Sequence, residues 1–383
     1  MSELKANTYI YEIAAEDLAV IFDCCAVEIR HIGSTVIPHV NKSRIVDIAV
    51  GVTGFNSVFK LIPELESRGY AHVQESGNNQ RILFEKYGET VCHIHVIIFD
   101  SPYWHECIGF RNYLCIDKRA ACRYEAYDGD KEEFFRQSAR KAQVYYFLGR
   151  TVNVTIDRPV GSPHPARDFT YPINYGCIDG VIAPDGEELD VYVLGDDTPR
   201  ETMTAKVIGI IHREDDVEDK LVAAVGATKY YQTDIEELTD FQECYYKTKV
   251  TGLYQKSCGA VVCRRSSEMI EFLILHQKMS RTWSFPKGHA EAYETEEETA
   301  VREIKEETNI TAELISGFRE TVSYTISGLV EKEVVLFLAL TDSNVTPQFE
   351  EVEDFLWADR ETALKLLSHS AYAEILPRAE NML

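Results

Sequence analysis

The segment that most restricts how this chain can fold is residues 288–310, which read GHAEAYETEEETAVREIKEETNI. Thr295 is followed three residues later by Glu298, and this capping-box spacing predicts that a helix begins here. Ala300 and Ile304 recur at a helical interval and predict the buried side of that helix. The segment therefore predicts one amphipathic helix with a defined start.

Three carboxylates share one face of this predicted helix. Glu303, Glu306 and Glu307 fall at i, i+3 and i+4, so their side chains are neighbours and repel one another. Lys305 is the only basic residue between Glu303 and Glu307. A bound Mg²⁺ or Mn²⁺ removes the repulsion, because hard cations take oxygen ligands. We expect a divalent metal here, and the alternative is a solvated acidic helix.

The spacing of these residues resembles the Nudix box, whose pattern is G-x5-E-x7-R-E-U-x-E-E-x-G-U with U aliphatic. The last glycine of the pattern is Asn309, the next best residue for a left-handed position just past a helix. The resemblance implies a Nudix α/β/α sandwich over residues 252–383 and hydrolysis of a phosphoanhydride by metal-activated water. The matching residues are Gly288, Glu294, Arg302, Glu303, Ile304, Glu306, Glu307 and Ile310.

The Nudix resemblance also implies the roles of the box residues. Glu303, Glu306 and Glu307 would hold the metal, and Arg302 would orient one of them. The base would be one of these glutamates or a carboxylate outside the box.

Within the Nudix superfamily, residues 255–370 most resemble the asymmetrical diadenosine tetraphosphate hydrolases. The resemblance rests on the stretches SCGAVVCRR, WSFPKGH and GFRETVSYTI. It implies that Glu351 is a further catalytic or metal-site carboxylate, that Lys287 contacts phosphate, and that Tyr324 stacks on adenine. Tyr324 can instead be a half-buried strand residue.

The middle of the chain carries a second acidic group. Residues 171–194, YPINYGCIDGVIAPDGEELDVYVL, place Asp185, Glu187 and Asp190 at a turn and a strand start, which suits a multi-metal site. The stretch resembles the Y-P-x-N-Y-G run and D-x-D-x-x-D motif of family I inorganic pyrophosphatases, which implies an OB-like β-barrel over residues 151–251. The resemblance assigns Asp157, Asp215 and Glu218 or Asp219 as further metal ligands, Lys220, Tyr246 and Lys247 as phosphate-handling residues, and Tyr175 as the site tyrosine.

This middle segment departs from the pyrophosphatase pattern between Asp157 and Tyr171. The family has a longer stretch there with a lysine, a glutamate and an arginine, and only Arg167 offers a replacement. We expect the fold and the metal site to be retained. Two alternatives remain open, an active pyrophosphatase and a relic barrel used for docking.

The first part of the chain resembles the GrpB (UPF0157) family over residues 5–148, through HIGST at residues 31–35, Asp47, the HIHV run and FRNYL. This implies a nucleotidyltransferase-like α/β domain over residues 1–150. In nucleotidyltransferases a Gly-Ser turn, here Gly33 and Ser34, holds nucleotide phosphate, and two carboxylates on one strand share the metals. Asp47 is present here, but the second position is Ala49.

The missing carboxylate leaves two readings of the HIHV run. His93 and His95 alternate onto one strand face and could replace the lost ligand. The alternative is a pair of histidines on a half-exposed strand.

Composition limits the partners and the compartment. Lys and Arg number 39 and Asp and Glu 63, so the net charge is −24. Such a surface repels nucleic-acid phosphates and anionic membranes. No apolar stretch approaches the roughly 20 residues that span a bilayer. The acidic start is unlike a signal peptide, and the scattered cysteines suit a reducing compartment. We expect a cytoplasmic protein and leave a homo-oligomer open.

Together these resemblances predict a Mg²⁺-dependent phosphoanhydride hydrolase. The Nudix domain would cleave a nucleoside polyphosphate, with diadenosine tetraphosphate to ATP and AMP as the first hypothesis. The middle domain would hydrolyse inorganic pyrophosphate, and the first domain would bind a nucleotide. One alternative makes the protein mainly a pyrophosphatase, and another makes it a non-enzymatic nucleotide sensor. A coupled hypothesis lets a transferase step in the first domain release the pyrophosphate that the middle domain removes.

Overall fold

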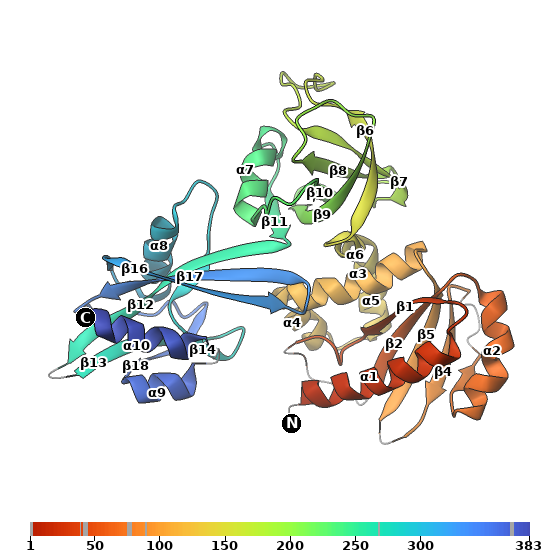
Figure 1. Ribbon diagram of the computed structural model, residues 1–383, viewed down its shortest axis with the longest axis horizontal. Helices are drawn as coiled ribbons and strands as arrows, with labels where there is room; N and C mark the ends of the chain where they lie inside the picture. The colour runs from red at the N-terminus through yellow and green to blue at the C-terminus, as the bar shows by residue number, and fades with distance from the viewer. Residues whose placement is uncertain are drawn as a thin grey trace. The chain divides into compact units, whose positions relative to one another are not determined.

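The structure, a computed structural model, describes residues 3–38, 40, 45–74, 79–88, 90–266, 269–367 and 371–383. The chain divides into two compact units, Met1–Val225 and Gly226–Leu383. Both units combine helices with β-sheet (Figure 1). The expected boundaries at residues 150 and 252 differ from the boundary between these units, which falls between Val225 and Gly226, and the three-domain division stays a prediction.

The first unit begins with a five-stranded sheet in the order β1-β2-β5-β4-β3. Strands β2 and β5 are parallel, and the other neighbours are antiparallel. The sheet and its first two helices are α1 (Glu3–Ile21), β1 (Ala26–Ile32), β2 (Ile45–Val52), α2 (Phe55–Ser67), β3 (Ala71–Val73), β4 (Arg81–Lys86) and β5 (Val91–Ile98).

Alternation along β2 and β5 gives this sheet two different faces. Val46, Ile48 and Val50 lie in a core with the apolar residues of α1 and α2. Because successive side chains point to opposite faces, Asp47 and the two histidines of β5 face away from that core. The helices that follow are α3 (Pro102–Ile116), α4 (Lys118–Ala126), α5 (Lys131–Ala142) and α6 (Val144–Phe147).

The first unit continues with five strands that close into a barrel. Their order is β10-β8-β7-β6-β9, and β9 and β10 also pair, which closes the ring. This confirms the expected OB-like barrel. The strands are β6 (Thr151–Arg158), β7 (Asn174–Ile182), β8 (Glu188–Leu194), β9 (Thr202–Arg213) and β10 (Lys220–Ala224).

The second unit is built around a sheet in which β14-β13-β12-β17-β16 form the main path, β15 pairs with β12, and β18 pairs with β13. Strands β12 and β17 are parallel. The elements are α7 (Gln232–Glu243), β11 (Thr248–Gly252), β12 (Tyr254–Ser266), β13 (Met269–Gln277), β14 (Thr282–Ser284), β15 (Lys287–His289), α8 (Glu296–Thr308), β16 (Glu313–Ile326), β17 (Val330–Leu340), β18 (Val352–Ala358), α9 (Arg360–Leu366) and α10 (Tyr372–Met382).

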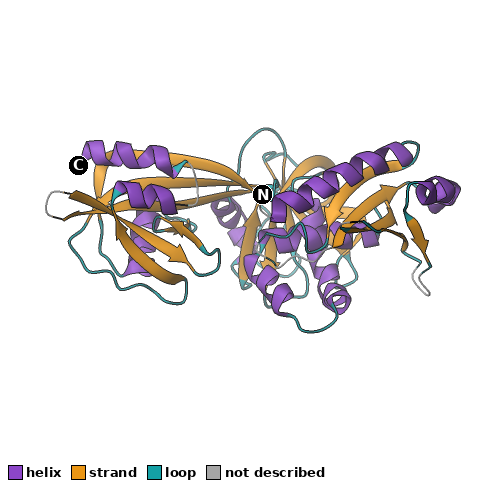
Figure 2. Cartoon of the chain, turned by 90° about the horizontal axis from the view of Figure 1, so that it is seen from below, coloured by secondary structure: helices purple, strands orange, loops and turns teal. Residues whose placement is uncertain are grey.

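Helices cover both faces of this sheet. On one face Cys258 and Ala260 of β12 pack with Ala300 and Ile304 of α8. On the other face Val261 of β12 packs with the buried residues of α9 and α10. Figure 1 shows α8 on one side of the strands and α9 and α10 on the other, and Figure 2 shows α10, beside the mark C, along the orange strands. This confirms the expected α/β/α sandwich.

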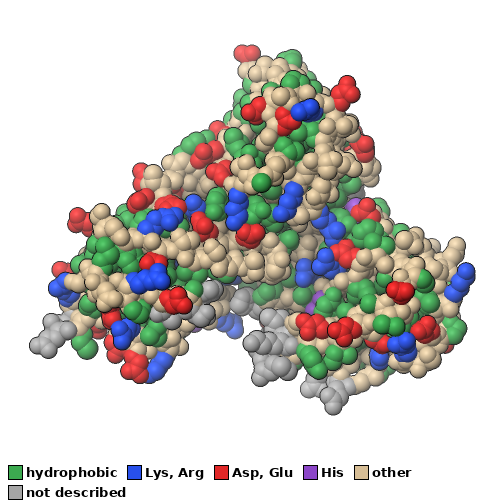
Figure 3. All heavy atoms as spheres, viewed as in Figure 1, with side chains coloured by type: hydrophobic (Ala, Val, Ile, Leu, Met, Phe, Trp, Pro, Cys, Tyr) green, Lys and Arg blue, Asp and Glu red, His purple; other side chains and the backbone are tan. Residues whose placement is uncertain are grey.

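The surface and the cysteines add two observations. On the face seen in Figure 3, acidic side chains are dispersed among basic and neutral ones. All ten cysteines are free thiols. Among the helices of the described residues, none is long and apolar enough to cross a membrane.

Candidate active sites

Helix α8 has the ends that its sequence predicts. Thr295 Oγ1 accepts a hydrogen bond from the Glu298 backbone N–H at 3.2 Å, and Glu298 Oε2 accepts one from the Thr295 N–H at 2.9 Å. At the other end Asn309 adopts φ 58° and ψ 14°, the left-handed conformation. Both the capping box and the asparagine in place of glycine are confirmed. These ends fix where the three box glutamates lie.

Arg302 is the centre of the polar contacts on α8. Its Nε and Nη2 donate to the two carboxylate oxygens of Glu294 at 2.7 and 2.9 Å. Its Nη1 donates to Glu303 at 2.9 Å and to Glu306 at 3.2 Å, and Nη2 also donates to the His289 carbonyl at 2.9 Å. The guanidinium holds the pKa of Glu294 down at about 2. Arg302 therefore contacts two of the three box glutamates, Glu303 and Glu306, where the resemblance implied that it orients one.

Two of the three box glutamates are buried. The exposed fraction of Glu303 is 8% and that of Glu307 is 3%. Burial raises the pKa of Glu307 to about 7, although its oxygens accept hydrogen bonds from Gln277 Nε2 at 2.7 Å and the Lys287 N–H at 3.0 Å. Burial also raises the pKa of Glu303 against the opposing effect of Arg302. Burial therefore disfavours the charged form of both carboxylates, and a nearby positive charge would oppose this effect.

Strand β15 brings the backbone against this carboxylate group. Gly288 pairs with Cys258 of β12. A Cβ atom at Gly288 would lie 2.0 Å from Glu303 Oε2. The first glycine of the box therefore makes room for a metal-ligand candidate.

The predicted residues outside the box lie in different surroundings. Glu351 is exposed in the turn just before β18, and its charge contributes to the raised pKa of Glu303. Burial lowers the pKa of Lys287. Tyr324 is partly buried and packs against the core on the α9 and α10 side of the sheet, which is compatible with the alternative reading of a half-buried strand residue. Its contact with adenine stays a prediction.

The acids of the barrel gather around a buried lysine. Parallel pairing of β10 with β8 sets Leu221 opposite Val191, which brings Lys220 beside Asp190. Lys220 Nζ forms ion pairs with both Asp190 and Glu218. Burial raises the pKa of Glu218, and Asp190 and Asp185 add to that rise. The structure therefore brings together Asp190 and Glu218, two acids that lie 28 residues apart in the sequence.

Tyr175 and Asp157 belong to the same neighbourhood. Tyr175 is buried, its pKa is raised well above the ordinary value by burial, and it hydrogen-bonds with Asp190. Burial raises the pKa of Asp157, Arg158 opposes this effect, and Asp190 adds to it. Both residues therefore feel the charge of Asp190, and the retained metal site stays a prediction.

The remaining acids of the barrel divide into two groups. Asp219 Oδ2 lies 2.7 Å from His212 Nδ1, so Glu218 and not Asp219 faces Lys220. Asp185, Glu187 and Asp215 are exposed. Tyr246 and Lys247 follow α7 in the second unit, and their place in the site of the first unit stays a prediction.

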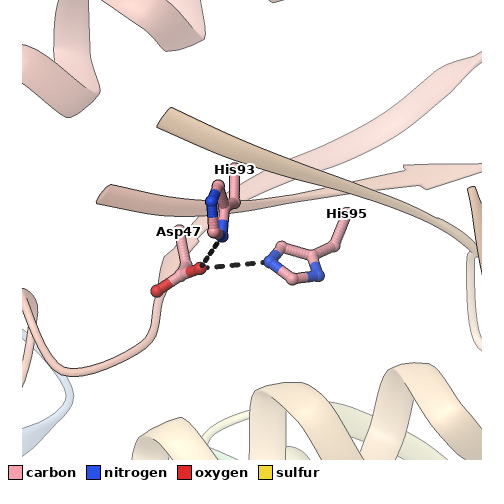
Figure 4. Close-up of side chains that lie close together, drawn as sticks. All are labelled: Asp47, His93 and His95. Atoms are coloured by element: carbon pink, nitrogen blue, oxygen red, sulfur yellow. Dashed lines mark hydrogen bonds and ion pairs between the residues drawn. The ribbon is translucent and has the colours of Figure 1, made fainter. Parts of the chain in front are cut away.

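The N-terminal sheet assembles Asp47, His93 and His95. Parallel pairing of β2 and β5 sets Asp47 opposite His93. Asp47 Oδ1 lies 3.2 Å from His95 Nε2 and 3.5 Å from His93 Nδ1 (Figure 4). Burial raises the pKa of Asp47, but the hydrogen bonds of the two imidazoles outweigh this effect and bring it to about 2. A Cβ atom at Gly33 would lie 2.2 Å from Asp47 Oδ2, so the Gly33–Ser34 turn adjoins the carboxylate.

Sequence reasoning missed two neighbours of this group. Arg81 and Glu85 both lie on β4, which pairs with β5. Arg81 Nη1 is 3.1 Å from His95 Nδ1, and Glu85 Oε1 is 3.5 Å from His93 Nε2. Only the strand pairing reveals them, although their spacing of four residues on one strand is a signal that both face the same side.

A further group was also missed. Cys177 Sγ donates to Glu188 at 3.2 Å, and Asp179 completes a trio in which one ligand atom from each residue lies within 4.8 Å of the others. Glu188 also accepts from the Gly180 N–H at 2.8 Å. Among the described residues, this trio and the Asp47 trio are the groups that meet this spacing, and the Nudix glutamates are more widely spread.

Three family models match the chain in order. They are GrpB protein over residues 6–150, inorganic pyrophosphatase over residues 143–251, and NUDIX domain over residues 253–379. The order agrees with the expected resemblances.

Curated relatives match the same three parts. A bis(5'-nucleosyl)-tetraphosphatase [asymmetrical] of Caenorhabditis elegans is 32% identical over 126 residues, which are 32% of this chain and 91% of the relative. The glutamate-rich protein GrpB of Alkalihalophilus pseudofirmus is 32% identical over 26% of this chain and 60% of its own length. Inorganic pyrophosphatase 1 of Pseudomonas syringae pv. tomato is 34% identical over 27% of this chain and 59% of its own length.

The geometry of the box and the match over 91% of the tetraphosphatase relative's length point to the same family. Residues 253–379 match the NUDIX domain and carry the capped helix with its Arg302-centred glutamates. Through this part the chain belongs to the NUDIX family, and it is a hydrolase of phosphorus-containing acid anhydrides.

Proposed function

We propose that the Nudix domain hydrolyses a dinucleoside polyphosphate, with diadenosine tetraphosphate cleaved to ATP and AMP. The observation that carries this proposal is the Arg302-centred set of glutamates, in which Glu303 and Glu307 are buried with raised pKa values. The tetraphosphatase relative supports the choice of substrate.

The donor set fits a divalent metal. Glu303, Glu306 and Glu307 offer oxygen ligands only, which suits Mg²⁺ or Mn²⁺ better than a softer metal. When bound, the ion would supply a more acidic water and neutralise charge on the leaving phosphate. Within this set Arg302 fixes the carboxylate of Glu303, and two hydrogen bonds fix that of Glu307.

The proposed reaction is a hydrolysis in which water replaces the leaving group at one phosphorus. A water oxygen forms a bond to one phosphorus, the anhydride P–O bond breaks, and its oxygen leaves with the ATP or AMP part. The water proton passes to a carboxylate. We propose Glu351 or one of the box glutamates for this role, since Glu351 adds to the raised pKa of Glu303 and so lies within electrostatic reach of it.

A second candidate function is pyrophosphate hydrolysis in the barrel. It is favoured by the buried Lys220 between Asp190 and Glu218, with Tyr175 bonded to the same aspartate. A barrel kept only for docking would have no reason to bury a cation and its partner acids at one end of two paired strands. The GrpB-like part would bind a nucleotide at the Gly33–Ser34 turn.

The test is product analysis on the full-length protein with Mg²⁺. Diadenosine tetraphosphate and pyrophosphate are offered separately, to wild type and to Glu306→Gln and Asp190→Asn. We expect ATP plus AMP to be lost only with Glu306→Gln, and phosphate release only with Asp190→Asn. Glu297→Gln is the matched control, because Glu297 is an exposed acid on the same helix. Intact substrate with wild type would refute the corresponding activity.

A further inference from the structure

Asp47, His93 and His95 present three ligand atoms from neighbouring strands on one face of the N-terminal sheet. Their side chains remain 23%, 25% and 12% exposed, so the group opens to solvent. One ligand atom from each lies within 4.8 Å of the other two. In Figure 4 a nitrogen of each ring points at the same carboxylate oxygen.

The spacing of these atoms is that of ligands around one ion. With metal–ligand bonds of about 2.1 Å, two ligands of a tetrahedral ion lie about 3.4 Å apart. Asp47 Oδ1 lies 3.2 Å from His95 Nε2 and 3.5 Å from His93 Nδ1. These two separations match the tetrahedral edge, and the third, between the two imidazole nitrogens, is at most 4.8 Å, so an ion fits among them once the two rings turn toward it.

We propose that Asp47, His93 and His95 form a binding site for a divalent transition metal such as Zn²⁺. Two imidazole nitrogens and one carboxylate oxygen suit Zn²⁺ or Fe²⁺ better than Mg²⁺, which prefers oxygen ligands alone. Three protein ligands leave at least one coordination position for water or substrate, which distinguishes an open site from a closed structural one. None of its ligands belongs to the Nudix glutamates or to the barrel acids.

Glu85 completes the surroundings that a metal-binding histidine needs. Its carboxylate lies 3.5 Å from His93 Nε2, on the far side of the ring from Asp47. A proton on Nε2 pointing to Glu85 leaves the Nδ1 lone pair free for the metal. Carboxylates that hold the second nitrogen of a ligating histidine fix its tautomer and increase its basicity.

Arg81 and a bound metal require the ring proton of His95 on different nitrogens. A guanidinium only donates hydrogen bonds, so His95 Nδ1 accepts from Arg81 Nη1 at 3.1 Å, and the ring proton then lies on Nε2, toward Asp47. A metal on Nε2 moves that proton to Nδ1, where it would oppose the arginine. Metal binding therefore requires Arg81 to turn away, and removing its positive charge should tighten binding.

The test measures metal binding by the full-length protein, purified without a histidine tag. Zn²⁺ is titrated calorimetrically in excess Mg²⁺, which occupies sites made only of oxygen ligands, and Co²⁺ is added separately as an absorption probe for imidazole ligands. The variants are Asp47→Asn, His93→Gln and Arg81→Gln. His72→Gln is the matched control, because His72 lies in the same sheet beside Phe84. Thermal unfolding without metal checks that each variant folds.

We expect wild type and His72→Gln to bind one more Zn²⁺ than Asp47→Asn or His93→Gln, or to bind it at least about tenfold more tightly. We expect the visible absorption of bound Co²⁺ to weaken in His93→Gln, and Arg81→Gln to bind Zn²⁺ more tightly than wild type. Equal affinity and stoichiometry in all folded variants would overturn the proposal. Weaker binding in Arg81→Gln would overturn the tautomer argument.

Discussion

Gln232 Nε2 lies 3.3 Å from Nδ1 of His289, which joins the first residue of α7 to the end of strand β15. Gln232 also lies 3.5 Å from the Ala290 carbonyl, and Glu237 accepts from the Tyr293 N–H at 2.9 Å. Helix α7 falls within the pyrophosphatase match, yet it packs on the loop that leads into the Nudix helix.

The first prediction concerns this junction. Gln232→Ala should lower kcat for the Nudix substrate about 3- to 10-fold, because one lost hydrogen bond of about 1 kcal/mol loosens the loop whose His289 carbonyl holds Arg302. The measurement is steady-state hydrolysis of diadenosine tetraphosphate. Thr233→Ala, on the same turn, is the control, and an unchanged kcat in Gln232→Ala would show that α7 does not position the loop.

Arg302 should not tolerate lysine. Arg302→Lys keeps the charge but loses the paired contact with Glu294 and the fork that reaches Glu303 and Glu306, so we expect kcat to fall by about 100-fold. The control is Arg319→Lys, whose guanidinium pairs with the single acid Glu296 at the surface. If both variants keep wild-type kcat, Arg302 does not organise the site.

Glu307 should make the metal-free protein less stable as pH rises. Its pKa is about 7 in the folded state against an ordinary value of 4.5, so the folded state keeps a proton that the unfolded state loses. Stability is therefore lost between these two values and stays lower above them. Between about pH 5 and about pH 8, the free energy of unfolding of Glu307→Gln should therefore rise relative to that of wild type by an amount on the order of 1–3 kcal/mol.

The measurement for this prediction is urea unfolding of chelator-treated protein at the two pH values. Glu297→Gln serves as the control, because Glu297 is exposed. A difference between Glu307→Gln and wild type that does not change with pH would contradict a raised pKa at this position.

Lys220 should stabilise the barrel most strongly when no metal is bound. Lys220→Met leaves Asp190 and Glu218 as neighbouring carboxylates without a cation. Without metal we therefore expect the free energy of unfolding to fall by about 2–4 kcal/mol. Saturating Mg²⁺ should recover part of this loss by neutralising the same acids. The measurement is urea unfolding with and without Mg²⁺. An identical loss in both conditions would argue against a metal among these acids.

What the sequence could predict was set by local spacing. The start of α8 at Thr295, its end at Asn309 and the common face of its glutamates depend on residues fewer than fifteen positions apart, so a helical repeat determines them. The alternation of Cys258 and Val261 between two cores is likewise a local period. The two ends of α8 were predicted correctly.

The contacts that the sequence alone could not predict depend on which strands become neighbours in the sheets. Lys220 meets Asp190 through parallel pairing of β10 and β8, and Arg81 meets His95 through the pairing of β4 and β5. The face occupied by Tyr324 and the contact between Gln232 and His289 also depend on tertiary packing. A motif names such residues only when a known family has already placed them.

The two glycine positions of the box, 288 and 309, differ in which other residues can replace glycine there. Gly288 does not have a positive φ, so its backbone suits any residue, but the Glu303 carboxylate fills the place of a side chain. Position 309 has the opposite requirement, because its left-handed backbone limits the residue while a side chain is accommodated, and an asparagine occupies it. Replacing the second glycine by asparagine therefore costs the fold little, whereas even alanine at the first position would displace the Glu303 carboxylate from the site.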